Sequence, residues 1–127
     1  MIKSKFISNI LDLLSDGDTI GQSIRQQINF LTETECTYTG VGVFVRFSHA
    51  EGINKFKVDN QKLILNGVII RSREIGLGAE AIVFCDKGLV DYLEIWSHDG
   101  EYPTKELETY TLTQEWPGSP GRKVLVE

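Results

Sequence analysis

Histidine, cysteine and carboxylate side chains are the groups in this chain that could support acid–base, nucleophilic or metal chemistry. His98 stands in a turn beside Asp99, and Glu94 lies four residues earlier in a segment with a strand pattern. Four residues of extended chain span about 13 Å, so Glu94 and His98 would meet only if the chain turned sharply at Ser97. We therefore interpret His98 as a surface turn residue and not as half of an acid–base pair.

Nucleophilic, metal and nucleotide motifs are also missing from the sequence pattern. Cys36 and Cys85 show neither a CxxC pair nor a zinc spacing, and their apolar, strand-like contexts favour buried thiols over a disulfide. A site with His49 and His98 would need a third metal ligand that the pattern does not supply. No serine lies in a GxSxG motif, and the GVG at residues 40–42 lacks the third glycine and the following helix of a dinucleotide site. We expect no catalytic residue, metal or cofactor, and hence no enzyme.

The remaining notable side chains are aromatic and acidic, and they gather in residues 78–103. Residues 79–85 and 89–96 are rich in β-branched and aromatic side chains on either side of Asp86-Lys87-Gly88, which predicts a hairpin. Aromatics beside carboxylates on a half-exposed face are typical of interface anchors. We therefore expect partner-binding residues at the far end of the hairpin and in the next turn: Glu80, Tyr92, Glu94, Trp96, His98, Asp99 and Glu101. The alternative is that a helix covers Tyr92 and Trp96.

Two registers are open for this hairpin. A three-residue loop with a bulge at Gly88 places Glu80 opposite Glu94, a like-charge pair that is unfavourable. A two-residue turn at Lys87 and Gly88 places Ala81 opposite Glu94 but requires a positive φ at Lys87. We favour the three-residue loop. One face then forms a core face that includes a single charged residue: Ala79, Ala81, Val83, Cys85, Leu89, Asp91, Leu93 and Ile95.

Length and charge narrow the class of protein. The 127 residues are close to the common size of one domain, and we expect a single domain over residues 1–127. The 13 basic and 18 acidic residues give a net charge of −5, which argues against nucleic acid as a partner and is compatible with a basic protein. Asn9 and Asp12 interrupt the first apolar run, which argues against a signal peptide, and no stretch approaches the ~18 apolar residues of a membrane span. We expect a cytoplasmic protein without membrane contact, and its oligomeric state is left open.

The elements around the hairpin follow from periodicity. Apolar residues recur at helical spacing in residues 2–15 and again in residues 19–32, which predicts an antiparallel helix pair. Strands are expected at residues 36–48, 62–72, 105–116 and 123–126, with a short edge strand at residues 56–58. Gly40 and Gly42 mark either a bend or a close neighbour, and Asn66-Gly67 is either a hairpin turn or a bulge. The predicted fold class is α+β, with the helix pair packed on a mostly antiparallel sheet of about five to seven strands.

Three segments resemble a known family: GVGVFVRF at residues 40–47, LNGVII at residues 65–70, and residues 78–103 with GAEAIVF, YLEIWS and GEYP. They are similar to small bacterial immunity proteins encoded beside toxins in polymorphic-toxin and contact-dependent growth inhibition loci. The similarity covers residues 38–115. It implies a protein that binds one cognate toxin, often a nuclease with a basic surface, and neutralises it by occluding its active site. No site residue is carried over from the family.

Two other functions remain open at this stage. One is a small-ligand-binding or enzymatic cone-shaped α+β domain with a pocket between the helices and a curved sheet. A buried polar cluster that includes Glu94 or His49 would favour it, and a filled apolar core would disfavour it. The other is an oligomerising subunit that associates with itself through the face carrying Tyr92 and Trp96.

Overall fold

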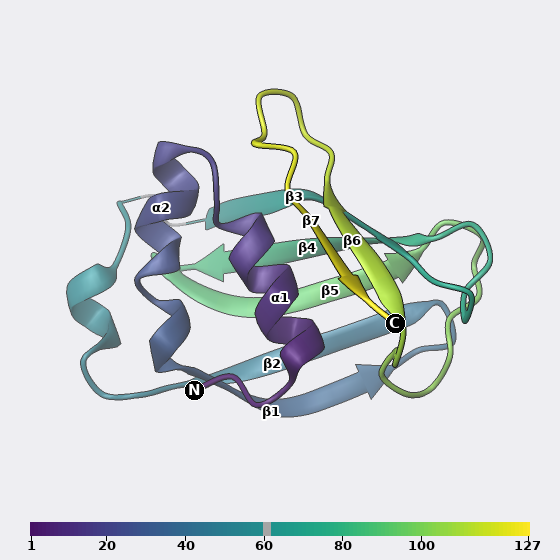
Figure 1. The fold of residues 1–127 in the computed structure, drawn as a ribbon. Coiled ribbons are helices and arrows are strands. Elements are labelled where there is room, and N and C mark those ends of the chain that lie inside the picture. Colours follow the sequence, from purple (N-terminus) through teal and green to yellow (C-terminus); the bar gives the residue numbers. More distant parts are fainter. Residues whose placement is uncertain (60–61) are drawn as a thin grey trace.

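A computed structural model describes residues 1–59 and 62–127, and within them seven strands form one antiparallel sheet behind two helices (Figure 1). The sheet order is β1-β2-β5-β4-β3-β6-β7. The α+β class and the antiparallel sheet are as predicted. The elements in chain order are α1 (Lys5–Leu14), α2 (Thr19–Arg25), the 3-10 helix η1 (Ile28–Phe30), β1 (Leu31–Tyr38), β2 (Gly42–His49), the 3-10 helix η2 (Ile53–Phe56), β3 (Lys62–Arg71), β4 (Ala79–Asp86), β5 (Leu89–Ser97), β6 (Tyr110–Gln114) and β7 (Lys123–Val126).

Helix α1 covers one face of the sheet. Ser4 caps it, since the Ile7 N–H donates to the Ser4 Oγ over 3.1 Å. Its apolar stripe is buried, with Ile10 and Leu13 fully inaccessible to solvent, and the helix contacts β3, β4 and β6. The strands present small and β-branched side chains such as Ala81 to the helix, so that α1 and the sheet pack closely.

The second helix is shorter than the predicted residues 19–32. Helix α2 begins after its cap Asp18, whose carboxylate accepts the Gly21 N–H, and it ends at Arg25. It contacts α1 and runs in roughly the opposite direction (Figure 1). Beyond η1 the chain becomes the edge strand β1, whose side chains are mostly exposed. An edge strand exposed on both sides needs no apolar alternation, so periodicity did not reveal it.

The predicted strand at residues 36–48 is in fact the end of β1, a turn and β2. Gly40 takes a φ of 89° in the turn, so this glycine does mark a bend. Gly42 instead leaves room for a close neighbour, because a Cβ there would lie 1.9 Å from the carbonyl oxygen of Ile95. Cys36 is consequently exposed on the edge strand, contrary to the prediction, whereas Cys85 is buried, and both are free thiols.

Asn66-Gly67 forms a bulge inside a continuous strand and not a hairpin turn. The register of β3 against β4 shifts between Asn66 and Val68, and Gly67 has a φ of 106°. The ring of Trp116 lies against this glycine, and a Cβ there would come within 2.8 Å of it. The edge strand predicted at residues 56–58 is absent, since η2 ends at Phe56 and residues 57–58 are irregular. The strand predicted at residues 105–116 is limited to β6.

The turn of the β4–β5 hairpin has two residues, which contradicts the favoured three-residue loop. Lys87 and Gly88 both have positive φ, 53° and 81°, and Asp86 pairs with Leu89. A bulge at Asp91 follows, because Cys85 pairs with Val90 whereas Phe84 pairs with Tyr92. The final pairs are Glu80 with Trp96 and Ile82 with Glu94, so neither register considered from the sequence is correct.

A buried glutamine explains this bulge. The Gln27 side chain is fully inaccessible; its Oε1 accepts the Val90 N–H over 2.8 Å, and its Nε2 donates to the carbonyl oxygens of Gly88 and Phe56 over 2.9 and 3.0 Å. The glutamine thus satisfies backbone groups at the turn and the bulge. Asp91 leaves the core face on which it was predicted and pairs with Arg46, with 3.5 Å between Oδ1 and Nη1.

Candidate functional site: the open face of the sheet

The sheet face opposite α1 is the candidate functional site. Cross-strand pairing places one set of side chains from the four central strands together on that side, away from the buried residues that alternate with them. Within the part of the chain that the structure describes, both helices lie on the other side of the sheet, in front of it in Figure 1. We call this surface the open face, and its central residues are Phe44, Arg46, Ile64, Ile69, Glu80, Ile82, Phe84, Tyr92, Glu94 and Trp96.

Aromatic rings form the centre of the open face. Phe84 and Tyr92 are stacked with ring centroids 4.6 Å apart, and Phe44 lies 6.1 Å from Tyr92 on the other side. The guanidinium of Arg46 lies over the Tyr92 ring, 4.7 Å from its centroid. Sequence reasoning missed Phe44 and Phe84 as site residues, although alternation with the buried Val43 and Val83 marks both as facing the same way as Tyr92.

A hollow of about 320 Å³ lies next to this aromatic cluster. Ile64, whose side chain is 56% exposed, contributes an apolar wall together with Phe84 and Tyr92. The full lining is Lys62, Leu63, Ile64, Phe84, Cys85, Asp86, Asp91 and Tyr92. An apolar floor with a charged rim is the composition of a pocket that accepts an anchoring side chain of a partner.

Four of the predicted partner-binding residues meet on the open face. Glu80 pairs across the strands with Trp96, and Glu94 and Tyr92 precede Trp96 on the same side of β5. Trp96 is 37% exposed, and α1 lies on the opposite side of the sheet, so the alternative in which a helix covers Trp96 is wrong. His98 lies against Trp96, with ring centroids 5.1 Å apart in an edge-on arrangement.

The other two predicted residues lie in the loop beyond β5. Asp99 accepts hydrogen bonds from the Ser97 hydroxyl over 2.6 Å and from the Glu101 and Leu77 N–H groups over 3.2 and 3.3 Å. The Ser97 bond and the backbone donors hold the pKa of Asp99 below its ordinary value. Asp99 therefore holds the loop together, while Glu101 is exposed at its end.

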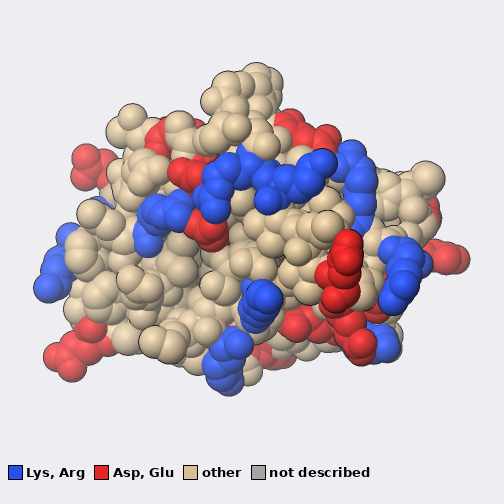
Figure 2. Space-filling view, in the orientation of Figure 1, with Lys and Arg blue, Asp and Glu red and all other residues tan. Residues whose placement is uncertain are grey.

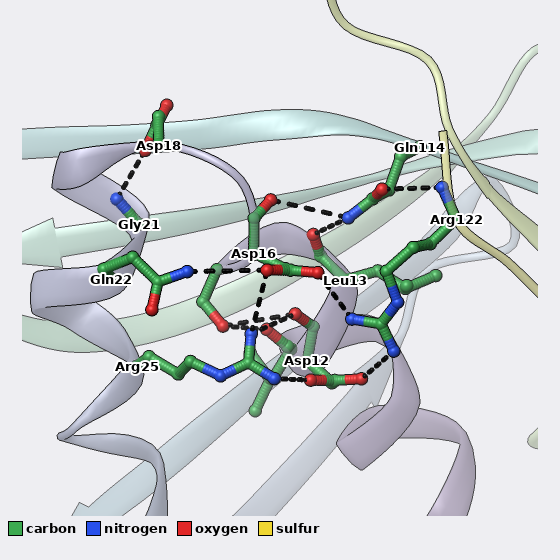
Figure 3. A network of polar contacts seen from close by, with 11 residues as sticks. Asp12, Leu13, Asp16, Asp18, Gly21, Gln22, Arg25, Gln114 and Arg122 are labelled. Carbon is green, nitrogen blue, oxygen red and sulfur yellow. Dashed lines mark hydrogen bonds and ion pairs between the residues drawn. The ribbon is translucent and has the colours of Figure 1, made fainter. Parts of the chain in front are cut away.

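On the helix-side surface Asp12 and Asp16 are paired with arginines, unlike Glu80 and Glu94 on the open face. Arg122 donates to Asp16 over 2.7 Å and to Asp12 over 2.9 Å, and Arg25 also pairs with Asp12 (Figure 3). The Gln114 side chain donates to the Leu13 carbonyl oxygen over 2.9 Å. This network ties α1 and α2 to the loop between β6 and β7. Figure 2 shows the result, a face on which Lys and Arg lie directly beside Asp and Glu.

The space between α1 and the sheet is filled with apolar side chains, which disfavours a ligand pocket there. Glu94 faces away from that space, and His49 is occupied by a 2.6 Å hydrogen bond between its Nε2 and the Val90 carbonyl oxygen. A hollow of about 400 Å³ lies instead beside the ends of β3, β6 and β7. Among residues 1–59 and 62–127, no His, Cys, Asp and Glu side chains group to hold a metal ion.

No helix in the described part of the chain has the length and apolar character needed to cross a bilayer. Comparisons with models of protein families, with curated protein sequences and with solved structures find no match to this chain. The resemblance to immunity proteins therefore stays a prediction.

Proposed function

We propose that this protein is an immunity-type inhibitor that binds a cognate toxin domain through the open face of its sheet and neutralises it by covering the toxin's active site. The observation that carries the proposal is the open face itself: stacked aromatic rings and half-buried or exposed apolar side chains on four central strands, with no layer of the described chain above them. Aromatic side chains gathered on an uncovered sheet face beside charged residues are typical of a protein interface.

The chemistry of the open face also suits the proposed partner. Its end near Trp96 carries Glu80 and Glu94, and the net charge of the whole chain is −5. Complementary potentials would speed association with a toxin that has a basic surface, as a nuclease needs for its phosphate substrate. In this proposal the protein acts in the cytoplasm, by occlusion alone and without a cofactor, while α1 and α2 support the sheet as one helical layer.

Co-expression tests the proposal. The proposal predicts an effector encoded beside this gene, and its toxin domain would be expressed with the wild-type protein or with Ile64→Arg, which places a charge in the hollow on the open face. Ile20→Arg is the matched control, because Ile20 is 43% exposed on α2. We expect growth with the wild type and with Ile20→Arg, and loss of growth with Ile64→Arg. Equal protection by all three proteins, or by none, contradicts the proposal, and circular dichroism checks that each variant is folded.

A further inference from the structure

We propose that Trp96, Glu80 and Glu94 form a slot for an arginine side chain of the partner. This inference rests on the proposed function, since it names the chemistry that one end of the open face recognises. It commits the partner to a guanidinium at that end of the sheet, and therefore orients the partner on the open face.

Glu80 and Glu94 differ from Asp91 and Glu115, two paired carboxylates on this side of the sheet. Elsewhere on the same side of the sheet, Asp91 pairs with Arg46 over 3.5 Å and Glu115 pairs with Arg71 over 2.6 Å. For Glu80 and Glu94, in contrast, the structure of residues 1–59 and 62–127 contains neither an ion pair nor a side-chain hydrogen bond. These two carboxylates stand beside Ile82, Ile69 and Trp96, where a partner's cation would be shielded from water.

The indole ring of Trp96 is accessible from the open face. Its cross-strand neighbour on β2 is Gly42, which contributes no side chain, and its neighbour on β4 is Glu80. His98 contacts the ring edge-on from the loop that follows. On its β2 side the indole therefore faces no cross-strand side chain, and the residue is 37% exposed, so a planar cation can lie against the ring there.

The placement of Glu80, Glu94 and Trp96 favours arginine over lysine as the bound side chain. Glu80 and Glu94 are diagonal neighbours on adjacent strands. Residues in this relation are roughly 7–8 Å apart, so both side chains can reach one ligand. A guanidinium has five donors in a rigid plane, so it can bond carboxylates at two edges while its face lies on an aromatic ring. A lysine ammonium has three donors but no planar face, so it cannot stack on the indole ring while it bonds both carboxylates.

Nuclear magnetic resonance provides the test. The nitrogen-labelled protein would be titrated with a hexa-arginine peptide, a hexa-lysine peptide and a hexa-citrulline peptide, while the indole N–H signals of Trp96 and Trp116 are followed. Trp116 is an internal control because it lies against Gly67, away from the slot. The double variant Glu80→Gln/Glu94→Gln would be compared with Glu51→Gln/Glu108→Gln, which removes the same charge from exposed positions off the open face.

We expect hexa-arginine to shift the Trp96 signal and to bind about ten-fold more tightly than hexa-lysine, with no binding by hexa-citrulline. The slot variant should bind hexa-arginine about ten-fold more weakly, and the control variant should match the wild type. Equal losses in both variants, or equal binding of the two basic peptides, overturn the slot. If the slot variant still neutralises the toxin while Ile64→Arg does not, the slot is wrong and the proposed function stands. If hexa-arginine binds at the slot but the protein protects against no toxin, the slot stands and the proposed function is wrong.

Discussion

The two faces of the β4–β5 hairpin are built from neighbouring residues of the same segment, yet they differ in what they contact. On the face toward α1, Ala81 and Val83 are buried and meet an apolar helix. On the open face, Ile82 and Phe84 are equally apolar but only half-buried, and neither Glu80 nor Glu94 forms an ion pair with a Lys or Arg of the described residues. The covered face therefore contributes to folding, whereas the open face retains apolar area and charge that a second molecule can use.

The largest expected effects lie on the helix side. Leu14→Ala or Ile24→Ala should lower the free energy of unfolding by about 2–5 kcal/mol, because both side chains are almost fully buried. Ile64→Ala on the open face should lower it by less than about 1 kcal/mol, since much of that side chain is already in water. Denaturant melts measure all three changes. Similar losses at Ile64 and Leu14 would show that a further layer covers the open face.

The second prediction concerns binding. Trp96→Ala should weaken binding to the cognate toxin by about 2 kcal/mol or more while the fold stays intact, because a partly exposed aromatic at an interface is a typical hot spot. Glu94→Lys should mainly slow association and reduce its dependence on salt. Binding kinetics at two ionic strengths measure both effects, and circular dichroism checks folding. If both variants bind as the wild type does, the contact lies elsewhere, and the acidic residues between Glu101 and Glu108 become the next segment to test.

A smaller effect is expected from acid. The hydrogen bond and charge of Arg122 hold the pKa of Asp16 below its ordinary value of 3.8. The lowered pKa stabilises the fold above that value, and the contribution is lost as the pH falls through the lowered pKa. Arg122→Gln should therefore be less stable than the wild type at neutral pH, with a difference that narrows below about pH 4. Arg73→Gln is the control, and a difference between wild type and Arg122→Gln that grows in acid would contradict the assignment.

The smallest expected effect concerns the two thiols, whose reactivity reports burial without any change to either face of the sheet. Cys36 is exposed on β1 and should react in the folded protein, whereas Cys85 is buried in the core, and burial together with the charge of Asp91 raises its pKa to about 12. Cys85 should therefore react only when the protein unfolds. A thiol reagent followed by absorbance should count one group in the native protein and two in denaturant without reductant. Rapid reaction of both thiols would show that the covered face is open.

The sequence predicted the elements whose signals are local. Alternating residues identified β4 and β5, and helical spacing identified α1. On this basis Glu80, Tyr92, Glu94 and Trp96 were assigned to one surface, and they do lie together. Three-dimensional contacts decided the rest. Trp116 needs Gly67 beneath it, which favours a bulge over a turn, and the polar edge strand β1 is specified by pairing with β2 and not by its own pattern.

Gln27 has a consequence for the order of folding events. A hairpin closes from local contacts within microseconds, and the β4–β5 segment offers at least three registers that satisfy its own turn chemistry. The observed register places the Val90 N–H against the Gln27 side chain, which comes from a segment 63 positions earlier in the chain. Packing of the segment that carries Gln27 therefore stabilises this register of the hairpin over the others. A register shifted by one residue would exchange the two faces and bury the carboxylates, and it would leave the buried amide without its partner.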